Sequence, residues 1–315
     1  MARAMTYLEA VATYLPPESV PIDKALAGLD ISESQIRLFQ RFYGFSRIRR
    51  EPTARLADQM LSTAAGLTAL RGREKDVRYV VQALTLPVSA PYPSNPVHDV
   101  RRALGLDHAV TFCLTQHACA TGLLAVDVCG KLLAADGDPN ALALIFTGEK
   151  AYTAYSQQFI IDTAVMGEGM AAILVRQGGD RDEVISYVTR THGQFNQAPW
   201  LTHEQAREFD QLYPEALAEV MLAAVEQADL TLDDITFVLP HHVNHNSWKR
   251  LSKRIGFPMS RIFLENLPEV GHCFCADPFI NYRTVSETGR LRRGDYYMMV
   301  SVGLGATFSA MVFRH

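Results

Sequence analysis

One cysteine of the sequence stands where its thiol could act as a nucleophile. Cys119 lies within Gln116–Gly122, where a predicted strand gives way to a predicted helix. The positive end of a helix dipole favours the thiolate form of a nearby cysteine, and the small neighbours of Cys119 would let a substrate approach closely. The alternative is that Cys119 is a small buried apolar residue, as we expect for Cys113 within the strand and Cys129 inside the helix.

Two other segments could supply a base for that thiol. His241 follows a short buried strand, at the edge where open α/β sheets place their sites. Gly271–Asp277 is a glycine turn that leads into a helix, and it contains both His272 and Asp277. A carboxylate five residues after a histidine can fold back across such a turn to hold one imidazole nitrogen, which fixes the tautomer and raises the basicity. A proline follows Asp277, so this residue could equally be an ordinary helix start.

A glycine-containing turn, Val302–Thr307, separates the last two predicted strands. Gly303 and Gly305 could simply form a tight hairpin. A turn without side chains could also direct backbone N–H groups at the oxyanion that forms when a carbonyl carbon is attacked.

Metal and redox chemistry are the weaker interpretations of the remaining clusters. Three histidines fall within residues 241–245, but their spacing is not that of a zinc-binding helix, and the cysteines other than Cys119 form no C-x-x-C pair. Cys273 and Cys275 alternate with Phe274, which favours packing. We therefore expect no metal site and no resident cofactor.

Strands and helices alternate along the chain, and their order repeats in the second half. Long apolar strands alternating with helices predict mostly parallel sheets covered by helices on both faces. The rhythm breaks near Gln177–Asp182, so we predict two halves, residues 1–178 with the cysteine and residues 179–315 with the histidines. The predicted strands are Met5–Leu15, Val77–Leu84, Ala109–Leu114, Ala141–Thr147, Met170–Val175, Val184–Thr191, Ile235–Leu239, Ile262–Leu264, Tyr296–Val302 and Thr307–Arg314; the helices are Arg55–Leu70, Asn95–Leu104, Thr121–Ala135, His203–Ala228, Asn246–Ile255 and Ala276–Glu287.

Composition excludes several classes of protein. The 315 residues carry a net charge of −4, which gives no electrostatic footprint for a nucleic acid or an anionic membrane surface. No run approaches the length of about 18 apolar residues that a membrane span needs. Five cysteines, an odd and small number, favour thiols in a reducing compartment, and we expect a cytoplasmic protein.

In chain order, the short motifs of this sequence resemble those of the thiolase superfamily, and of its β-ketoacyl-acyl-carrier-protein synthase III branch in particular. The resemblance covers nearly the whole chain and rests on Tyr14–Pro16, Gly44–Arg49, Ala118–Gly122, Gly167–Gly169, Pro240-His241, Gly271-His272 and the glycines 303 and 305. It implies the α/β thiolase fold, in which two similar βαβαβαββ halves form a five-layer αβαβα sandwich. It also implies a homodimer that pairs through the strand preceding the cysteine.

The resemblance assigns roles to several residues. Cys119 matches the nucleophile that takes an acyl group from a coenzyme A or acyl-carrier-protein thioester. His241 matches the catalytic histidine of a Pro-His-x-x-Asn stretch, with Asn244 as its asparagine. The Cys119 backbone N–H and Gly305 match the oxyanion hole, and Gly303 and Asn244 are expected to contact the substrate.

One departure from the family pattern separates two mechanisms. Synthase III has Gly-Asn where this chain has Gly271-His272, so the usual triad becomes Cys119, His241 and His272, as in elongating ketosynthases. Together with Asp277, the Gly-His pair instead looks like an offshoot of synthase III in specialised metabolism, whose members handle polyketide starter units or transfer acyl groups to alcohols and amines. The resemblance implies a Cys-His-Asp triad there, which this chain could build from Cys119, Asp277 and either His272 or His241. The first arrangement suits decarboxylative condensation with a malonyl thioester, and the second suits base-assisted transfer.

We therefore expect an acyltransferase that works through S-acyl-Cys119. The residues that usually grip coenzyme A at the entrance are Leu38 and Phe42 here, so the donor could be a carrier protein. The alternatives are a non-catalytic ketosynthase-like partner subunit and a housekeeping synthase that initiates fatty-acid synthesis.

Overall fold

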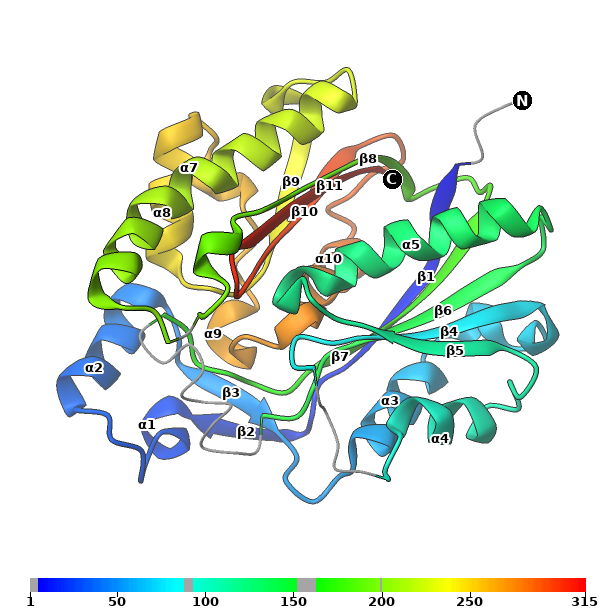
Figure 1. Ribbon diagram of the computed structural model, residues 1–315, viewed down its shortest axis with the longest axis horizontal. Helices are drawn as coiled ribbons and strands as arrows, with labels where there is room; N and C mark the ends of the chain where they lie inside the picture. The colour runs from blue at the N-terminus through cyan, green and yellow to red at the C-terminus, as the bar shows by residue number, and fades with distance from the viewer. Residues whose placement is uncertain (1–4, 88–92, 152–162, 199) are drawn as a thin grey trace.

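A large sheet runs through the molecule (Figure 1). The computed structural model describes residues 5–87, 93–151, 163–198 and 200–315. Their strands form a nine-stranded sheet in the order β5-β4-β6-β7-β1-β8-β11-β10-β9, and a separate antiparallel pair, β2-β3. The strands are β1 Thr6–Tyr14, β2 Glu18–Pro21, β3 Arg47–Arg50, β4 Val77–Ala83, β5 Val110–Leu114, β6 Leu142–Thr147, β7 Met170–Gln177, β8 Glu183–Thr191, β9 Ile235–Pro240, β10 Tyr296–Gly303 and β11 Thr307–Arg314.

Six of the described helices form three layers that alternate with the two halves of the sheet. The helices of the described residues are α1 Ile22–Ala25, α2 Glu33–Leu38, α3 Leu56–Ala65, α4 Pro96–Ala103, α5 Thr121–Asp136, α7 His203–Gln227, α8 His245–Ile255, α9 Leu267–Val270 and α10 Asp277–Glu287. Helices α3 and α4 cover the outer face of the first half, and α7 and α8 cover the outer face of the second. Helices α5 and α10 contact strands of both halves and form the middle layer. This is the five-layer arrangement expected of the thiolase fold.

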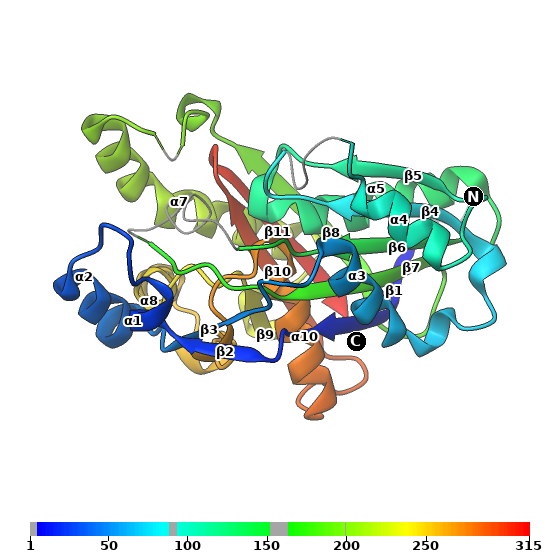
Figure 2. The same cartoon turned by 90° about the horizontal axis from the view of Figure 1, so that it is seen from below.

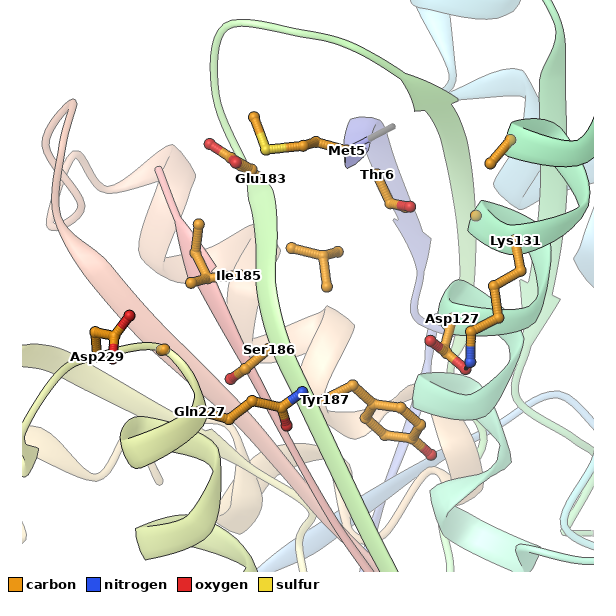
Figure 3. A pocket seen from close by; sticks show the side chains of 14 residues that line it. Met5, Thr6, Asp127, Lys131, Glu183, Ile185, Ser186, Tyr187, Gln227 and Asp229 are labelled. Carbon is orange, nitrogen blue, oxygen red and sulfur yellow. Dashed lines mark hydrogen bonds and ion pairs between the residues drawn. The ribbon is translucent and has the colours of Figure 1, made fainter. Parts of the chain in front are cut away.

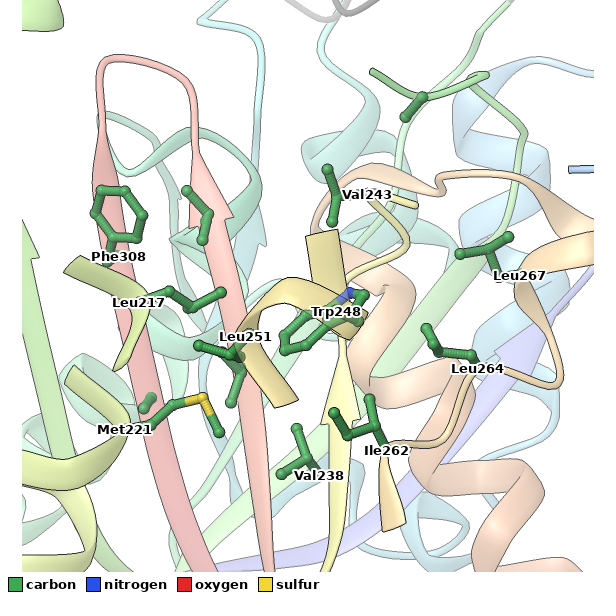
Figure 4. Packing of buried hydrophobic residues seen from close by; sticks show 14 of the residues in the cluster. Leu217, Met221, Val238, Val243, Trp248, Leu251, Ile262, Leu264, Leu267 and Phe308 are labelled. Carbon is green, nitrogen blue, oxygen red and sulfur yellow. The ribbon is translucent and has the colours of Figure 1, made fainter. Parts of the chain in front are cut away.

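Alternating side chains on the strands explain the layers. Along β10, Met298 and Val300 pack toward α7 and α8, while Tyr297 and Met299 face the middle layer. Figure 4 shows the outer core of the second half, where Trp248 of α8 lies among side chains of α7 and the sheet. Because both faces of these strands are buried, they are apolar throughout.

The predicted parallel character of the sheet is wrong. Only three of its eight strand pairings among the described residues are parallel, namely β4-β5, β4-β6 and β9-β10. The N-terminal strand β1 lies antiparallel between β7 and β8, and the turn after Gly303 makes β10 and β11 an antiparallel hairpin. These pairings depend on contacts that alternation along the chain does not reveal.

Most predicted elements are present, with ends displaced by a few residues. The predicted strand Ile262–Leu264 is wrong, because the segment contributes only a single bridge between Ile262 and Val238. The β2-β3 pair, α1 and α2 were not predicted; they lie beside α8 and α9, as Figure 2 also shows. The predicted boundary at residue 178 falls between β7 and β8, and the two halves of the sheet meet where Tyr7 pairs with Glu183.

Among the described helices, one stretch is long and apolar enough to cross a membrane, Ala118–Asp136. It comprises α5 and the turn before it, and 61% of its most apolar window is buried inside the protein. Contacts with strands of both halves account for its apolar composition.

Candidate active site

The turn that carries Cys119 is held in a strained conformation. Cys119 sits in a 3₁₀ turn, Ala118–Ala120, that continues into α5, and it is only 6% exposed. The residue before it, Ala118, has a φ of 45°, which non-glycine residues rarely adopt. The thiol therefore stands at the entry of a 16-residue helix, near the positive end of its dipole.

The β10-β11 hairpin packs against the turn that carries Cys119. Ser301 of β10 donates a hydrogen bond of 2.8 Å to the Cys119 carbonyl. Gly303 lies so close that a Cβ there would overlap the carbonyl oxygen of His117. A glycine is thus required at position 303 for close packing against the turn.

His272 and Asp277 form a chain of contacts with the thiol. The His272 Nε2 atom is 3.1 Å from the Cys119 Sγ atom, and His272 Nδ1 bonds to Asp277 Oδ2. The Asp277 carboxylate also accepts backbone N–H bonds of 2.7 Å from His242 and from Cys273. Asp277 is wholly buried and His272 is 2% exposed. The hydrogen bond between the two side chains confirms that Asp277 folds back onto His272.

His272 and Asp277 are stabilised in their charged forms, whereas the neighbouring imidazole of His241 is stabilised in its neutral form. Burial lowers the pKa of His272, but Asp277 and Cys119 outweigh it and raise the pKa to about 10. Burial raises the pKa of Asp277, and the charges of His242 and His272 with the hydrogen bonds reverse this and lower it overall. Burial together with the nearby His272 lowers the pKa of His241 to about 3, so its ring is neutral at pH 7.

His241 lies beside the Cys119–His272–Asp277 contacts but makes no hydrogen bond to any of these three side chains. Its ring centroid is 6.2 Å from that of His272, and its Nε2 atom is 3.1 Å from the hydroxyl of Tyr213 on α7. Its Nδ1 atom has no hydrogen-bond partner among the described residues. Trp248 donates to the His241 carbonyl over 3.1 Å and fixes the backbone there.

A small cavity of about 90 Å³ connects these groups. Its wall is mostly apolar, as expected for a site that shields an acyl group from water. The residues that line it are Cys119, Thr163, Phe209, Tyr213, His241, Val243, His272, Val302, Gly303 and Leu304.

Two residues that the sequence assigned to substrate or oxyanion binding, Asn244 and Gly305, lie outside the lining of this cavity. Both polar atoms of the Asn244 side chain bind the protein itself: Oδ1 caps α8 at Ser247 N over 2.8 Å, and Nδ2 donates to the Thr163 carbonyl over 3.0 Å. Asn244 therefore caps α8 and ties it to Thr163, and its contact with a substrate stays a prediction. Gly305, with a φ of 85°, is also outside the cavity lining, where Gly303 and Leu304 represent the turn.

Sequence reasoning missed two residues near the thiol, Thr85 and Tyr213, and gave His242 no role of its own. Thr85 directs its hydroxyl to the Cys119 Sγ atom over 3.6 Å, and Cys275 is 3.2 Å from that hydroxyl. Thr85 lies two residues after the end of β4, and the rule that sites lie at strand ends could have found it. Tyr213 lies inside a long helix and gave no signal. His242 was considered only as one of three histidines.

The side chains that raised a metal or redox site make other contacts. No group of three His, Cys, Asp or Glu side chains in the described ranges could hold a metal ion. The Cys273 thiol bonds to the Val270 carbonyl and the Cys275 thiol to the Ala118 carbonyl, over 3.6 and 3.2 Å, and all five cysteines are free.

A larger cavity of about 530 Å³ lies away from this chemistry (Figure 3). It opens between α5, β8 and the end of α7, and none of the cysteines or histidines lines it. Its Asp127 and Lys131 pair with each other over 2.7 Å, and Glu183 pairs with Arg314 over 2.7 Å. The smaller cavity is the candidate active site.

A thiol from the first half of the chain thus faces a histidine from the second, an arrangement that suits acyl transfer through the thiol. Residues 225–315 match the family model described as 3-oxoacyl-[acyl-carrier-protein (ACP)] synthase III C terminal. A β-ketoacyl-[acyl-carrier-protein] synthase III of Roseiflexus sp. (strain RS-1) is 26% identical over 81% of this chain and 82% of its own length. The chain is thus similar to synthase III proteins of the thiolase superfamily, through its C-terminal part in the family model and over most of its length in the curated relatives.

Solved structures agree on the fold. The acyltransferase ChlB3 superposes with a TM-score of 0.86 at 19% identity, covering 98% of this chain and 97% of its own. The β-ketoacyl-[acyl-carrier-protein] synthase III of Thermus thermophilus superposes with a TM-score of 0.82 at 21% identity, covering 98% of this chain and 99% of its own.

Proposed function

We propose that this protein transfers an acyl group from a coenzyme A or acyl-carrier-protein thioester to an alcohol or amine through S-acyl-Cys119. The observation that carries the proposal is the buried contact chain from the Cys119 thiol through His272 to Asp277. A thiolate splits one difficult acyl transfer into two easier steps, and an imidazole backed by a carboxylate serves each as acid or base.

In the first step, the Cys119 thiolate attacks the thioester carbonyl carbon. The oxyanion is held by the Cys119 backbone N–H and by a backbone N–H of the turn that follows Gly303, where the sequence assigned Gly305. Collapse of the intermediate breaks the carbon–sulfur bond of the donor, and His272 gives its proton to the departing thiolate. The products of this step are S-acyl-Cys119, neutral His272 and free donor thiol.

In the second step, neutral His272 takes the proton of the acceptor hydroxyl or amine as that group attacks the acyl carbon. Asp277 stabilises the imidazolium that forms. The carbon–sulfur bond to Cys119 then breaks, which regenerates the thiolate and the protonated histidine of the resting enzyme.

Decarboxylative condensation is the second candidate, and the names of the synthase III relatives favour it. That reaction would use His241 and His272 as donors to a malonyl thioester carbonyl. Here His241 Nε2 is already partnered by Tyr213, and His272 spans Cys119 and Asp277. The pairing supports base-assisted transfer, and with it a role in polyketide or other specialised metabolism over fatty-acid initiation. The presence of the complete contact chain argues against a non-catalytic partner subunit.

The experiment is intact-protein mass spectrometry after exposure to a panel of acyl-coenzyme A and acyl-carrier-protein thioesters. We expect a mass increment equal to the acyl group, and its complete loss in Cys119→Ala with the fold intact. The matched control is Cys113→Ala, which removes an exposed thiol and should keep the adduct. An adduct that persists without Cys119, or that maps to Cys275, would contradict the proposal. The panel also shows whether coenzyme A or an acyl-carrier protein is the donor. Leu38 and Phe42, both exposed, occupy the positions whose side chains usually bind coenzyme A in the similar family.

We also propose a homodimer that pairs through β5, in the cytoplasm, where the five free thiols would stay reduced. β5 is the terminal strand of the sheet, and Val110 on it is 59% exposed. An exposed strand edge is a template for pairing with a second copy. Light scattering at micromolar concentration should give twice the chain mass, and Val110→Lys should shift it toward one chain. A single-chain mass for the unmodified protein would refute the dimer.

A further inference from the structure

We infer that His242 is a positioning residue, a buried imidazolium that holds Asp277 in the orientation in which Asp277 pairs with His272. The inference rests on the proposed function and adds a fourth side chain to its site. His242 is fully buried, does not line the reactive cavity, and takes no part in the two steps above.

The first ring nitrogen of His242 must carry a proton. Its Nδ1 atom lies 2.8 Å from the Gly271 carbonyl oxygen and 3.2 Å from Asp277 Oδ1. A carbonyl oxygen accepts hydrogen bonds and cannot donate them. Nδ1 is therefore the donor.

The second ring nitrogen must carry a proton as well. The Nε2 atom lies 3.0 Å from Asn281 Oδ1. The orientation of the Asn281 amide is fixed because its Nδ2 donates to the Pro240 carbonyl over 2.8 Å and its Oδ1 accepts from Asn266 Nδ2 over 3.0 Å. Turning the amide over would set two carbonyl oxygens against each other. With both nitrogens as donors, the ring carries a positive charge.

That charge lies against the carboxylate that the mechanism needs. Asp277 has no exposed surface, and an isolated buried carboxylate is unstable as an anion. His242 contacts Oδ1 through its ring, and its backbone N–H donates to Oδ2. Asp277 thus stays anionic whether or not His272 carries a proton.

The remaining titratable groups around His272 are the Cys119 thiol, neutral His241 and Glu149. Burial raises the pKa of Glu149 to about 8, and His272 acts in the opposite direction. Because the ring of His242 contacts Asp277 Oδ1 while His272 contacts Oδ2, the His242 cation offsets part of the carboxylate's pull on the His272 proton. His272 can then release that proton during turnover.

The first test is independent of activity. Nitrogen-15 NMR of the full chain with labelled histidine at pH 8 should show a buried ring with both nitrogens protonated that disappears in His242→Gln and remains in His272→Gln. The matched control is His108→Gln, which replaces an exposed histidine and should leave that signal in place. Absence of such a ring in the folded wild-type protein would overturn the inference, even if Cys119 is acylated as proposed.

The second test uses acyl-Cys119 prepared with an activated thioester. In His242→Gln, we expect Cys119 acylation within a few-fold of wild type and transfer slowed about 10- to 100-fold. Because removing a cation favours protonated His272, the midpoint of the pH–rate profile for transfer should rise by about one pH unit. A role confined to packing would lower thermal stability and leave that midpoint unchanged. A midpoint that stays or falls overturns the inference.

Discussion

The two sides of the candidate site are built in different ways. The cysteine side is a matter of backbone: a strained turn, a helix end and a glycine pressed against a carbonyl hold Cys119 in place. The histidine side is a network of buried side chains, in which His272, Asp277, His242 and Asn281 satisfy one another. The first fixes where the thiol points, and the second fixes where protons reside.

This difference predicts different responses to substitution. On the histidine side, a change of one atom type alters a charge and hence a step of the reaction, with little change in shape. On the cysteine side, a change of one methyl group alters the shape and leaves every charge in place. Variants of each kind therefore test whether the division is correct.

The largest effect is expected from Asp277→Asn on the histidine side. Loss of the carboxylate removes the tautomer and charge partner of His272, so transfer from acyl-Cys119 should slow by about 10³–10⁴-fold. His272→Ala should likewise accumulate acyl-Cys119 and stall before transfer. Rapid-quench mass spectrometry of preacylated enzyme measures this step alone.

The same variant separates the rival mechanisms. If the protein carries out decarboxylative condensation with His241 and His272 as donors, Asp277→Asn should cost much less. If His272→Ala blocks acylation itself while preacylated enzyme turns over normally, the division of labour between the two steps is wrong.

A smaller effect, on shape, is expected from Gly303→Ala on the cysteine side. The new methyl group would overlap the His117 carbonyl and push the turn away from His272, which should destabilise the fold by about 2 kcal/mol or more and slow acylation. The matched control is Gly193→Ala, where a Cβ would meet nothing within 4 Å. Urea denaturation and the acylation rate give both quantities. Unchanged acylation in Gly303→Ala would show that the turn tolerates displacement.

The sequence predicted what is local in this structure. β4, α5 and α7 were predicted because each is a long apolar or amphipathic segment bounded by clear breaks. The pairing of His272 with Asp277 was predicted because both lie on one short turn. The antiparallel position of β1 was missed, since its residues pair with partners 156 to 176 residues away. His242 escaped notice for the same reason: its ring partners, Gly271 and Asn281, are 29 and 39 residues distant.

The smallest effect is expected from His241→Gln, and it appears in the pH dependence of stability. His241 has its pKa lowered to about 3 in the folded protein, first by burial and then by His272, against about 6.5 for an exposed histidine. The unfolded chain therefore binds a proton at this site as the pH falls below about 6.5, while the folded chain stays neutral down to about 3. The stability due to neutral His241 is fully present above pH 6.5 and is lost progressively toward pH 3. Replacing it by glutamine should make the melting temperature fall less steeply over that window, with little change at pH 8. Tyr213→Phe is the control, because it removes the hydroxyl partner and leaves the imidazole to titrate. Equal slopes for wild type and His241→Gln would mean that folding does not lower the pKa of His241, which would contradict the neutral, buried ring described here.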